Sequence, residues 1–162
     1  MIKTIVILLT TTISVINVPS NSRQSTSNRN IRFEFTAARM PDYKDMIEIK
    51  AVLYNDNDTA VSFLSMSCDG DQYLLKYDTA KFMVYPFIAC NSDHVLVQKI
   101  PARGKYEFKA HCQLKTKQLN IGLGVYLYQV DRKFDVKKFD RKMFYPLVYK
   151  EENVIDGGVK SL

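Results

Sequence analysis

The sequence lacks an apolar run long enough to cross a membrane. Its most apolar stretch, residues 5–16 of 162, is interrupted by threonine at positions 10–12, whereas a membrane-spanning helix needs about 20 predominantly apolar residues. We therefore expect no stable membrane anchor. A short apolar region behind Lys3 is typical of a secretory signal peptide. The pattern predicts a cleaved signal peptide at residues 1–22 and a secreted or periplasmic mature protein.

Cysteine is scarce as well, and none lies near the predicted cleavage site. A lipid-anchored export signal needs a cysteine there for acylation, so the mature chain should be free of the membrane. Export makes disulfide bonds chemically reasonable, and three cysteines allow one bridge and one free thiol. Counting alone leaves the three pairings of Cys68, Cys90 and Cys112 open.

Neither sign of charge dominates. Only one of the 23 basic residues, Lys3, lies in the predicted leader, which leaves 22 basic against 17 acidic side chains. This balance is ordinary for a soluble protein, and the remaining length fits one domain. Residues 23–30 contain no apolar side chain and predict a polar tether. We expect one domain at residues 31–150 and a flexible C-terminal tail at 151–162.

No convincing amphipathic helix is present, and strand patterns dominate instead. Apolar and polar residues alternate with period two, which is typical of half-buried strands. Residues 131–142 fit neither period and are predicted to form a loop or one short helical turn. Seven to eight strands separated by turn residues predict an all-β fold, an antiparallel sandwich of the immunoglobulin or fibronectin type. We predict strands at residues 31–37, 47–54, 60–66, 81–85, 95–100, 105–114, 119–127 and 144–150.

The strand pattern favours one cysteine pairing. Cys112 shares an inward row with Phe108 and Ala110, where a cysteine behaves as a small apolar side chain. Cys68 ends a predicted strand and Cys90 precedes a polar turn. A bridge between them would close a loop of about 20 residues, which the chain-entropy treatment values at roughly 3 kcal/mol. We predict a Cys68–Cys90 disulfide, with Cys112 buried and free.

The sequence also lacks a convincing catalytic or metal-binding motif. Residues 92–94, Ser-Asp-His, contain the three residue types of a hydrolase triad, but consecutive residues rarely approach one another as a triad requires, and no Gly-x-Ser-x-Gly elbow exists. His111 and Cys112 are strand neighbours that point to opposite faces, which prevents both from binding one ion. The acidic turns at 56–58 and 69–71 complete no calcium loop. We therefore expect a non-enzymatic protein without a metal or other cofactor.

One strand face is a candidate ligand platform. Gly122, Gly124, Tyr126 and Tyr128 fall on the same side of the strand pattern that begins at residue 119. Glycine permits close approach, and aromatic rings with a polar tip are common where ligands bind. The pattern predicts a platform for a glycan or a peptide. The alternative is that both faces of this strand are covered within the sandwich.

The segment 131–142 is rich in basic side chains but is diluted by three aspartates. Nucleic-acid binding requires a denser patch with base-stacking aromatics. We therefore expect a solvated loop and no nucleic-acid partner. The basic side chains are those of Arg132, Lys133, Lys137, Lys138, Arg141 and Lys142.

Three short motifs resemble those of a group of uncharacterised small secreted immunoglobulin-like β-sandwich proteins of bacteria that have a two-cysteine pattern. They are Phe-Leu-Ser-Met-Ser-Cys at 63–68, Cys-Asn at 90–91 and Ile-Pro-Ala-Arg-Gly-Lys-Tyr-Glu-Phe at 100–108. The similarity covers roughly residues 46–128. It implies the fold and export, and the group has no established activity to transfer.

Together these observations predict a secreted, monomeric, non-enzymatic interaction module that binds a protein or glycan partner. The alternative is an inhibitor of a secreted protease or other hydrolase, because a small sandwich can present a rigid loop to an active site. The candidate inhibitory loops are residues 69–72 and 92–94.

Overall fold

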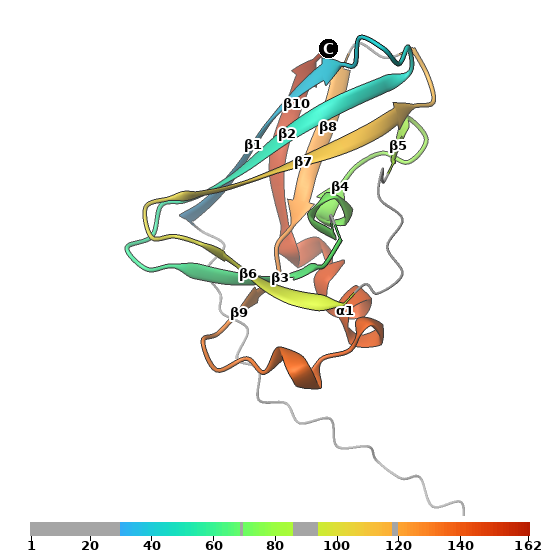
Figure 1. The fold of residues 1–162 in the computed structure, drawn as a ribbon. Helices are drawn as coiled ribbons and strands as arrows, with labels where there is room; N and C mark the ends of the chain where they lie inside the picture. Colours follow the sequence, from blue (N-terminus) through green and yellow to red (C-terminus); the bar gives the residue numbers. More distant parts are fainter. Residues whose placement is uncertain (1–29, 69, 86–93, 118–119) are drawn as a thin grey trace, which may run out of the picture.

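The computed structural model describes residues 30–68, 70–85, 94–117 and 120–162. Within these residues the chain is mostly antiparallel β-sheet, with one α-helix (Figure 1). The largest sheet has the order β1-β2-β7-β5, formed by β1 (Ile31–Arg39), β2 (Met46–Asn55), β7 (Lys105–Leu114) and β5 (Phe82–Val84). Two three-stranded sheets complete the structure. They are β10 (Val154–Ser161), β8 (Asn120–Tyr126) and β4 (Leu75–Lys76), and β6 (Val95–Ile100), β3 (Val61–Met66) and β9 (Gln129–Val130).

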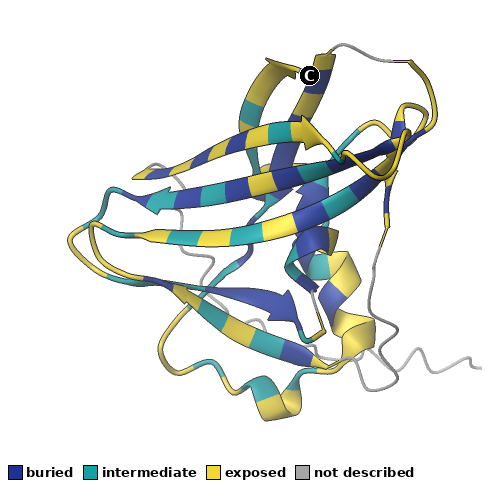
Figure 2. Cartoon of the chain, turned by 45° about the horizontal axis from the view of Figure 1, so that its top comes forward, coloured by how far each residue is buried: buried dark blue, intermediate teal, exposed yellow. Residues whose placement is uncertain are grey.

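Alternation of apolar and polar residues determines which face of the large sheet is buried. In β1, Ile31, Phe33 and Phe35 are buried while the residues between them are exposed. The register places Phe33 beside Leu53 and Phe35 beside Ala51 of β2, so the apolar residues of neighbouring strands share one face. Figure 2 shows the resulting bands of buried and exposed residues along these strands.

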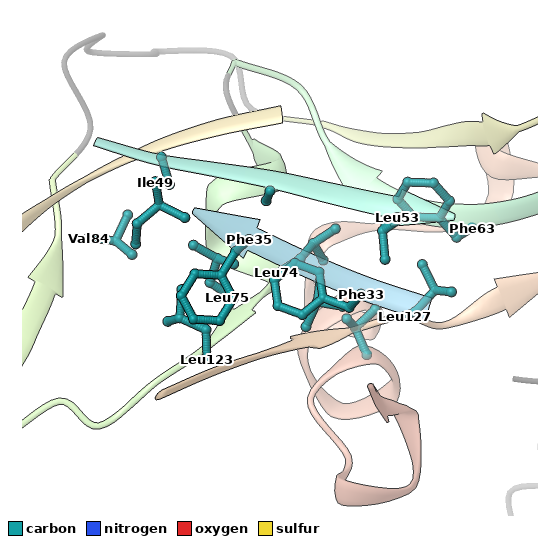
Figure 3. Packing of buried hydrophobic residues seen from close by; sticks show 14 of the residues in the cluster. Phe33, Phe35, Ile49, Leu53, Phe63, Leu74, Leu75, Val84, Leu123 and Leu127 are labelled. Atoms are coloured by element: carbon teal, nitrogen blue, oxygen red, sulfur yellow. The ribbon is translucent and has the colours of Figure 1, made fainter. Parts of the chain in front are cut away.

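The core lies between the large sheet and the other elements. Phe33 and Phe35 point from β1 toward Leu74, Leu75 and Leu123, which come from the elements on the other side of the core (Figure 3). These side chains belong to one continuous cluster of buried apolar residues. The predicted strands at 95–100 and 105–114 match β6 and β7 to the residue.

The strand predicted at 144–150 is wrong, because this segment belongs to helix α1 (Arg141–Val148). Asp140 caps the helix by accepting a hydrogen bond from the backbone N–H of Met143 at 3.0 Å. Phe144 and Val148, four residues apart, are the buried positions of the helix. A 3-10 turn, η3 (Val136–Lys138), precedes it, as expected for the short helical turn predicted within 131–142.

The flexible tail predicted at 151–162 is also wrong. Residues 151–153 form a 3-10 turn, η4 (Glu151–Asn153), and β10 follows and pairs with β8. Gly157 and Gly158 form an irregularity in this pairing, between Asp156 and Val159. Gly158 has φ +73°, and a Cβ on Gly157 would lie 2.7 Å from Cδ1 of Phe33. Glycine therefore lets β10 pass closely over the Phe33 ring.

Candidate ligand-binding face

The outer face of β8 contains three of the four predicted platform residues. Ile121, Leu123 and Val125 are buried toward the core, so Gly122, Gly124 and Tyr126 lie on the opposite side of the strand. Gly122 is exposed and Tyr126 is half-buried, whereas Gly124 is covered by its neighbours.

Tyr128 does not belong to this platform, which corrects the sequence prediction. Only 7% of its surface is exposed, and Leu127 beside it is buried as well. The alternation ends because β8 stops at Tyr126, and just before β9 the carbonyl of Tyr128 accepts a hydrogen bond from the N–H of Leu64 at 3.1 Å. The side chain of Tyr128 therefore belongs to the hydrophobic core.

An open groove of about 550 Å³ runs over the glycines of β8. Lys76 of β4 and Asp156 of β10 flank Gly124 on its two sides, and Val159 lies beside Gly122. At Gly124 a Cβ would come within 3.1 Å of the carbonyl oxygen of Ile155, so packing there favours glycine. At Gly122 the nearest atom would be 3.5 Å away, an ordinary contact. Packing does not require a glycine at position 122. The absence of a side chain there leaves the groove open.

Four tyrosines gather at the end of β8 that lies near α1, and we call them the tyrosine cluster. The rings of Tyr126 and Tyr149 meet edge to face with centroids 5.0 Å apart, and Tyr145 stacks on Tyr149 at 5.6 Å. The hydroxyl of Tyr149 donates to the carbonyl oxygen of Tyr73 at 2.8 Å. Tyr73 and Tyr145 are exposed. The cluster therefore brings together η2 (Gly70–Leu74), β8 and α1.

The hydroxyl of Tyr149 remains protonated at neutral pH and acts as a hydrogen-bond donor within the tyrosine cluster. Burial raises the pKa of Tyr149, and the neighbouring tyrosines, Tyr145 first, raise it further. Phe144 lies beneath, with its ring centroid 6.2 Å from that of Tyr149. Sequence analysis missed Tyr73, Tyr145 and Tyr149. A helical interpretation of 141–149 would have placed Tyr145 and Tyr149 on one face, since they lie four residues apart.

The groove and the cluster meet at Lys76. Its ammonium donates to Oε2 of Glu151, and this hydrogen bond raises the pKa of Lys76, with smaller contributions from the charges of Glu151 and Asp156. Asp156 in turn accepts a hydrogen bond from the N–H of Gly158 at 2.9 Å. The ligand-binding face, meaning the groove and the tyrosine cluster together, thus offers ammonium, carboxylate and hydroxyl groups beside aromatic rings.

A second trough, of about 570 Å³, lies on the outer face of β1, β2 and β7. Charged side chains in and beside this trough form ion pairs across and along the strands. Arg32 pairs with Glu34 at 2.9 Å, and Lys105 pairs with Glu107 at 2.6 Å. Lys109 donates to Glu48 at 3.0 Å. We regard this face as a solvated ladder of ion pairs.

The first candidate inhibitory loop is not an exposed loop. Gly70 and Gln72 are buried in η2, and Asp71 points back into the fold. Ser65 donates its hydroxyl to Oδ1 of Asp71, and Tyr106 donates to Oδ2 at 2.5 Å. Residues 69 and 92–93 lie outside the described part of the chain.

His94, the remaining residue of the second loop, is exposed and joins the ends of β3 and β6. Its backbone N–H donates to Oγ of Ser67 at 2.9 Å, and its Nδ1 lies 3.2 Å from the same oxygen. His111 is half-buried, with Nε2 3.7 Å from Oε2 of Glu48. Among the residues with described positions, no group of three His, Cys, Asp or Glu side chains is placed to hold a metal ion.

Cys112 is buried and free, as the sequence predicted. Burial raises the pKa of its thiol to about 12. Cys90 lies outside the described residues, so its pairing with Cys68 stays a prediction.

Comparison with protein-family models finds no match to this chain, and neither does comparison with curated proteins. Among the helices in the described ranges, none is both long enough and apolar enough to cross a membrane.

Proposed function

We propose that this chain is a secreted, non-enzymatic binding module that holds a glycan on its ligand-binding face. The observation that carries the proposal is the continuity of that face. Gly122 opens the groove, Lys76 and Asp156 flank it, and Tyr126 leads from it into the tyrosine cluster. Sugars present both apolar ring faces and many hydroxyls, and this mixture of aromatic, ammonium and carboxylate groups suits them.

The properties of the groove favour a glycan over a peptide. Its walls combine the charged groups of Lys76 and Asp156 with the small apolar side chain of Val159. A peptide that docks by its side chains needs deeper apolar pockets for its anchors. A protein partner is the alternative, and binding to no glycan in the test described below would favour it.

We further propose that the fold is an immunoglobulin-type sandwich. Only Leu127 and Tyr128 separate β8 from β9, so the two small sheets share one nearly continuous strand. The combined order is then β10-β8/β9-β3-β6, with β4 also paired to β8, facing β1-β2-β7-β5. Apart from β4 and β5, these orders correspond to strands G-F-C-C′ and A-B-E of the immunoglobulin arrangement. Export is supported by the signal-peptide pattern at residues 1–22.

The test is a binding screen of the purified chain against an array of neutral and charged oligosaccharides, followed by titration with the tightest binder. Tyr126→Ala should weaken binding roughly tenfold, because it removes an aromatic contact. Gly122→Leu should block the groove while the fold survives, since a Cβ there meets nothing closer than 3.5 Å.

The matched control is Tyr54→Ala, which removes a half-buried tyrosine from the outer face of the large sheet, where Arg32 lies 4.8 Å from its ring. Affinity should be unchanged in this variant, and circular dichroism should confirm that all three variants are folded. Loss of binding in Tyr54→Ala alone would indicate that the glycan binds at the ladder of ion pairs instead. Binding to no glycan at all would overturn the proposed function.

Inhibition of a hydrolase is the second candidate, retained from the sequence because the exposed His94 lies on one of the two proposed loops. Its support is weaker, since Asp71 of the other loop accepts hydrogen bonds from β3 and β7 and so points back into the fold. A panel of secreted proteases and glycosidases tests it directly. Inhibition that His94→Ala abolishes would favour this function over glycan binding.

A further inference from the structure

The segment Asp131–Lys142, which we call the basic segment, uses its three aspartates to shape its own backbone. Asp131 accepts a hydrogen bond from the N–H of Lys133 at 2.8 Å, and Asp135 accepts one from the N–H of Lys137 at 3.2 Å. Asp140 caps α1. All three carboxylates are therefore engaged with nearby N–H groups, as is usual for aspartates in turns and caps.

The basic side chains of the segment are directed to solvent instead. Arg132, Lys133, Lys137 and Lys142 are exposed, and in the described part of the chain they form no ion pair. Lys138 pairs with Asp135 at 3.4 Å but is itself exposed. Six basic residues against three aspartates leave a local excess of three positive charges.

The basic segment is anchored to the fold. Phe134 and Phe139 pack against each other with ring centroids 5.3 Å apart, and both are half-buried against the core cluster together with Val136. The basic segment is thus packed onto the core and its backbone is held in place. This lowers the conformational entropy that is lost when a ligand binds to its positive charges.

Arg141 joins the basic segment to the tyrosine cluster. Its Nη2 donates to the hydroxyl of Tyr145 at 2.9 Å, and its guanidinium carbon lies 5.6 Å from the centre of that ring. Tyr145 stacks in turn on Tyr149. Aromatic rings and exposed positive charges are therefore neighbours on one continuous surface.

We propose that the ligand is an acidic polysaccharide, whose sugar rings occupy the ligand-binding face while its carboxylate or sulfate groups contact the basic segment. This inference rests on the proposed glycan-binding function. The carboxylates of Asp156 and Glu151 favour a polysaccharide over a nucleic acid. A single nucleic-acid strand carries a negative charge about every 3.4 Å and would place phosphates against them, whereas an acidic glycan can place an uncharged ring there.

The experiment compares three probes by isothermal titration of the purified chain: oligogalacturonate, the same oligosaccharide with its carboxylates methyl-esterified, and single-stranded DNA. Oligogalacturonate should bind most tightly, and its affinity should fall as salt is added. Lys133→Glu/Lys137→Glu should weaken this binding about tenfold, because two exposed ionic contacts are reversed. Binding of the methyl ester should change little in that variant.

The matched control is Lys44→Glu/Lys117→Glu, which makes the same change in net charge at two exposed lysines outside the basic segment. It should leave binding nearly unchanged, and equal losses in both variants would overturn the inference. Equal affinity for the acidic oligosaccharide and its ester would also overturn it while the proposed function stands. DNA binding as tight as that of oligogalacturonate would contradict the choice of a glycan. If neither oligosaccharide binds, the inference fails, and the array of neutral and charged oligosaccharides then decides whether the proposed function stands.

Discussion

Tyr106 donates its hydroxyl to Oδ2 of Asp71 across 2.5 Å, and this bond joins β7 to η2. The other carboxylate oxygen of Asp71 accepts from Ser65 of β3. One side chain therefore ties together two strands that belong to different sheets. Burial raises the pKa of Tyr106, and the hydrogen bond to Asp71 raises it further, so the phenol remains a donor throughout the neutral range.

Asp71→Asn should destabilise the protein by about 1–3 kcal/mol, because an amide cannot accept both hydrogen bonds. Tyr106→Phe should cost less, about 1 kcal/mol, since it removes one bond and leaves Ser65 in place. Urea denaturation measures both changes. The exposed carboxylate of Asp42 provides the control: Asp42→Asn should be neutral, and equal stability of the two Asn variants would contradict a structural role for Asp71.

Asn153 holds the end of α1 in place. Its side-chain amide donates to the carbonyl oxygens of Leu147 and Val148, at 2.7 and 3.0 Å, and only 6% of the residue is exposed. Asn153→Asp removes both donors and places a carboxylate against two carbonyls, so we expect a loss of about 2–3 kcal/mol at neutral pH. Thermal unfolding checks this. A melting temperature that Asn153→Asp leaves unchanged would show that the amide does not secure the helix.

Gly157 should tolerate no side chain. In Gly157→Ala the new Cβ would lie 2.7 Å from Phe33 and 3.0 Å from the carbonyl oxygen of Leu123, which predicts a loss of about 1–3 kcal/mol. Gly122→Ala is the matched control, because its Cβ meets only ordinary contacts and should change stability by about 0.5 kcal/mol or less. Similar denaturation midpoints for the two variants would mean that β10 does not pass over Phe33 as described.

Cys112 should make the free energy of unfolding depend on pH in the alkaline range. Its thiol has a pKa of about 12 in the folded protein and of about 8.5 when unfolded. Because the folded pKa is raised, the protein keeps its full stability below the unfolded value and loses stability as the pH rises from there toward 12. Cys112→Val should remove this part of the dependence of stability on pH. Denaturation midpoints at pH 7.5 and 10 measure it, and identical slopes in the two proteins would contradict it.

Thiol alkylation followed by intact-mass measurement tests the predicted Cys68–Cys90 bridge. The folded, unreduced protein should gain no label, because Cys112 is buried and the predicted bridge would pair the other two cysteines. Denaturation without reduction should add one label, and denaturation with reduction should add three. Three labels without reduction would refute the bridge.

Local alternation was enough to predict much of the fold. Side-chain direction in a strand is determined by the neighbouring residues along the chain, which is why β6 and β7 were located to the residue and Cys112 was placed inside. The same reasoning identified Gly122 and Tyr126 as residues of an outward strand face. It failed at Tyr128, where the strand ends and the period no longer applies.

Tertiary contacts decided the rest. Gly157 and Gly158 suggest a loose end until Phe33, more than a hundred residues earlier, is found beneath Gly157. Residues 144–150 suggest a strand until the Asp140 cap and the burial of Phe144 and Val148 select a helix. Likewise Tyr73 and Tyr149 are 76 residues apart and meet through one hydrogen bond. The sequence by itself determined which strand faces are apolar, because that pattern is local. Only the folded chain determined the candidate ligand-binding face, because its residues come from segments that packing alone brings together.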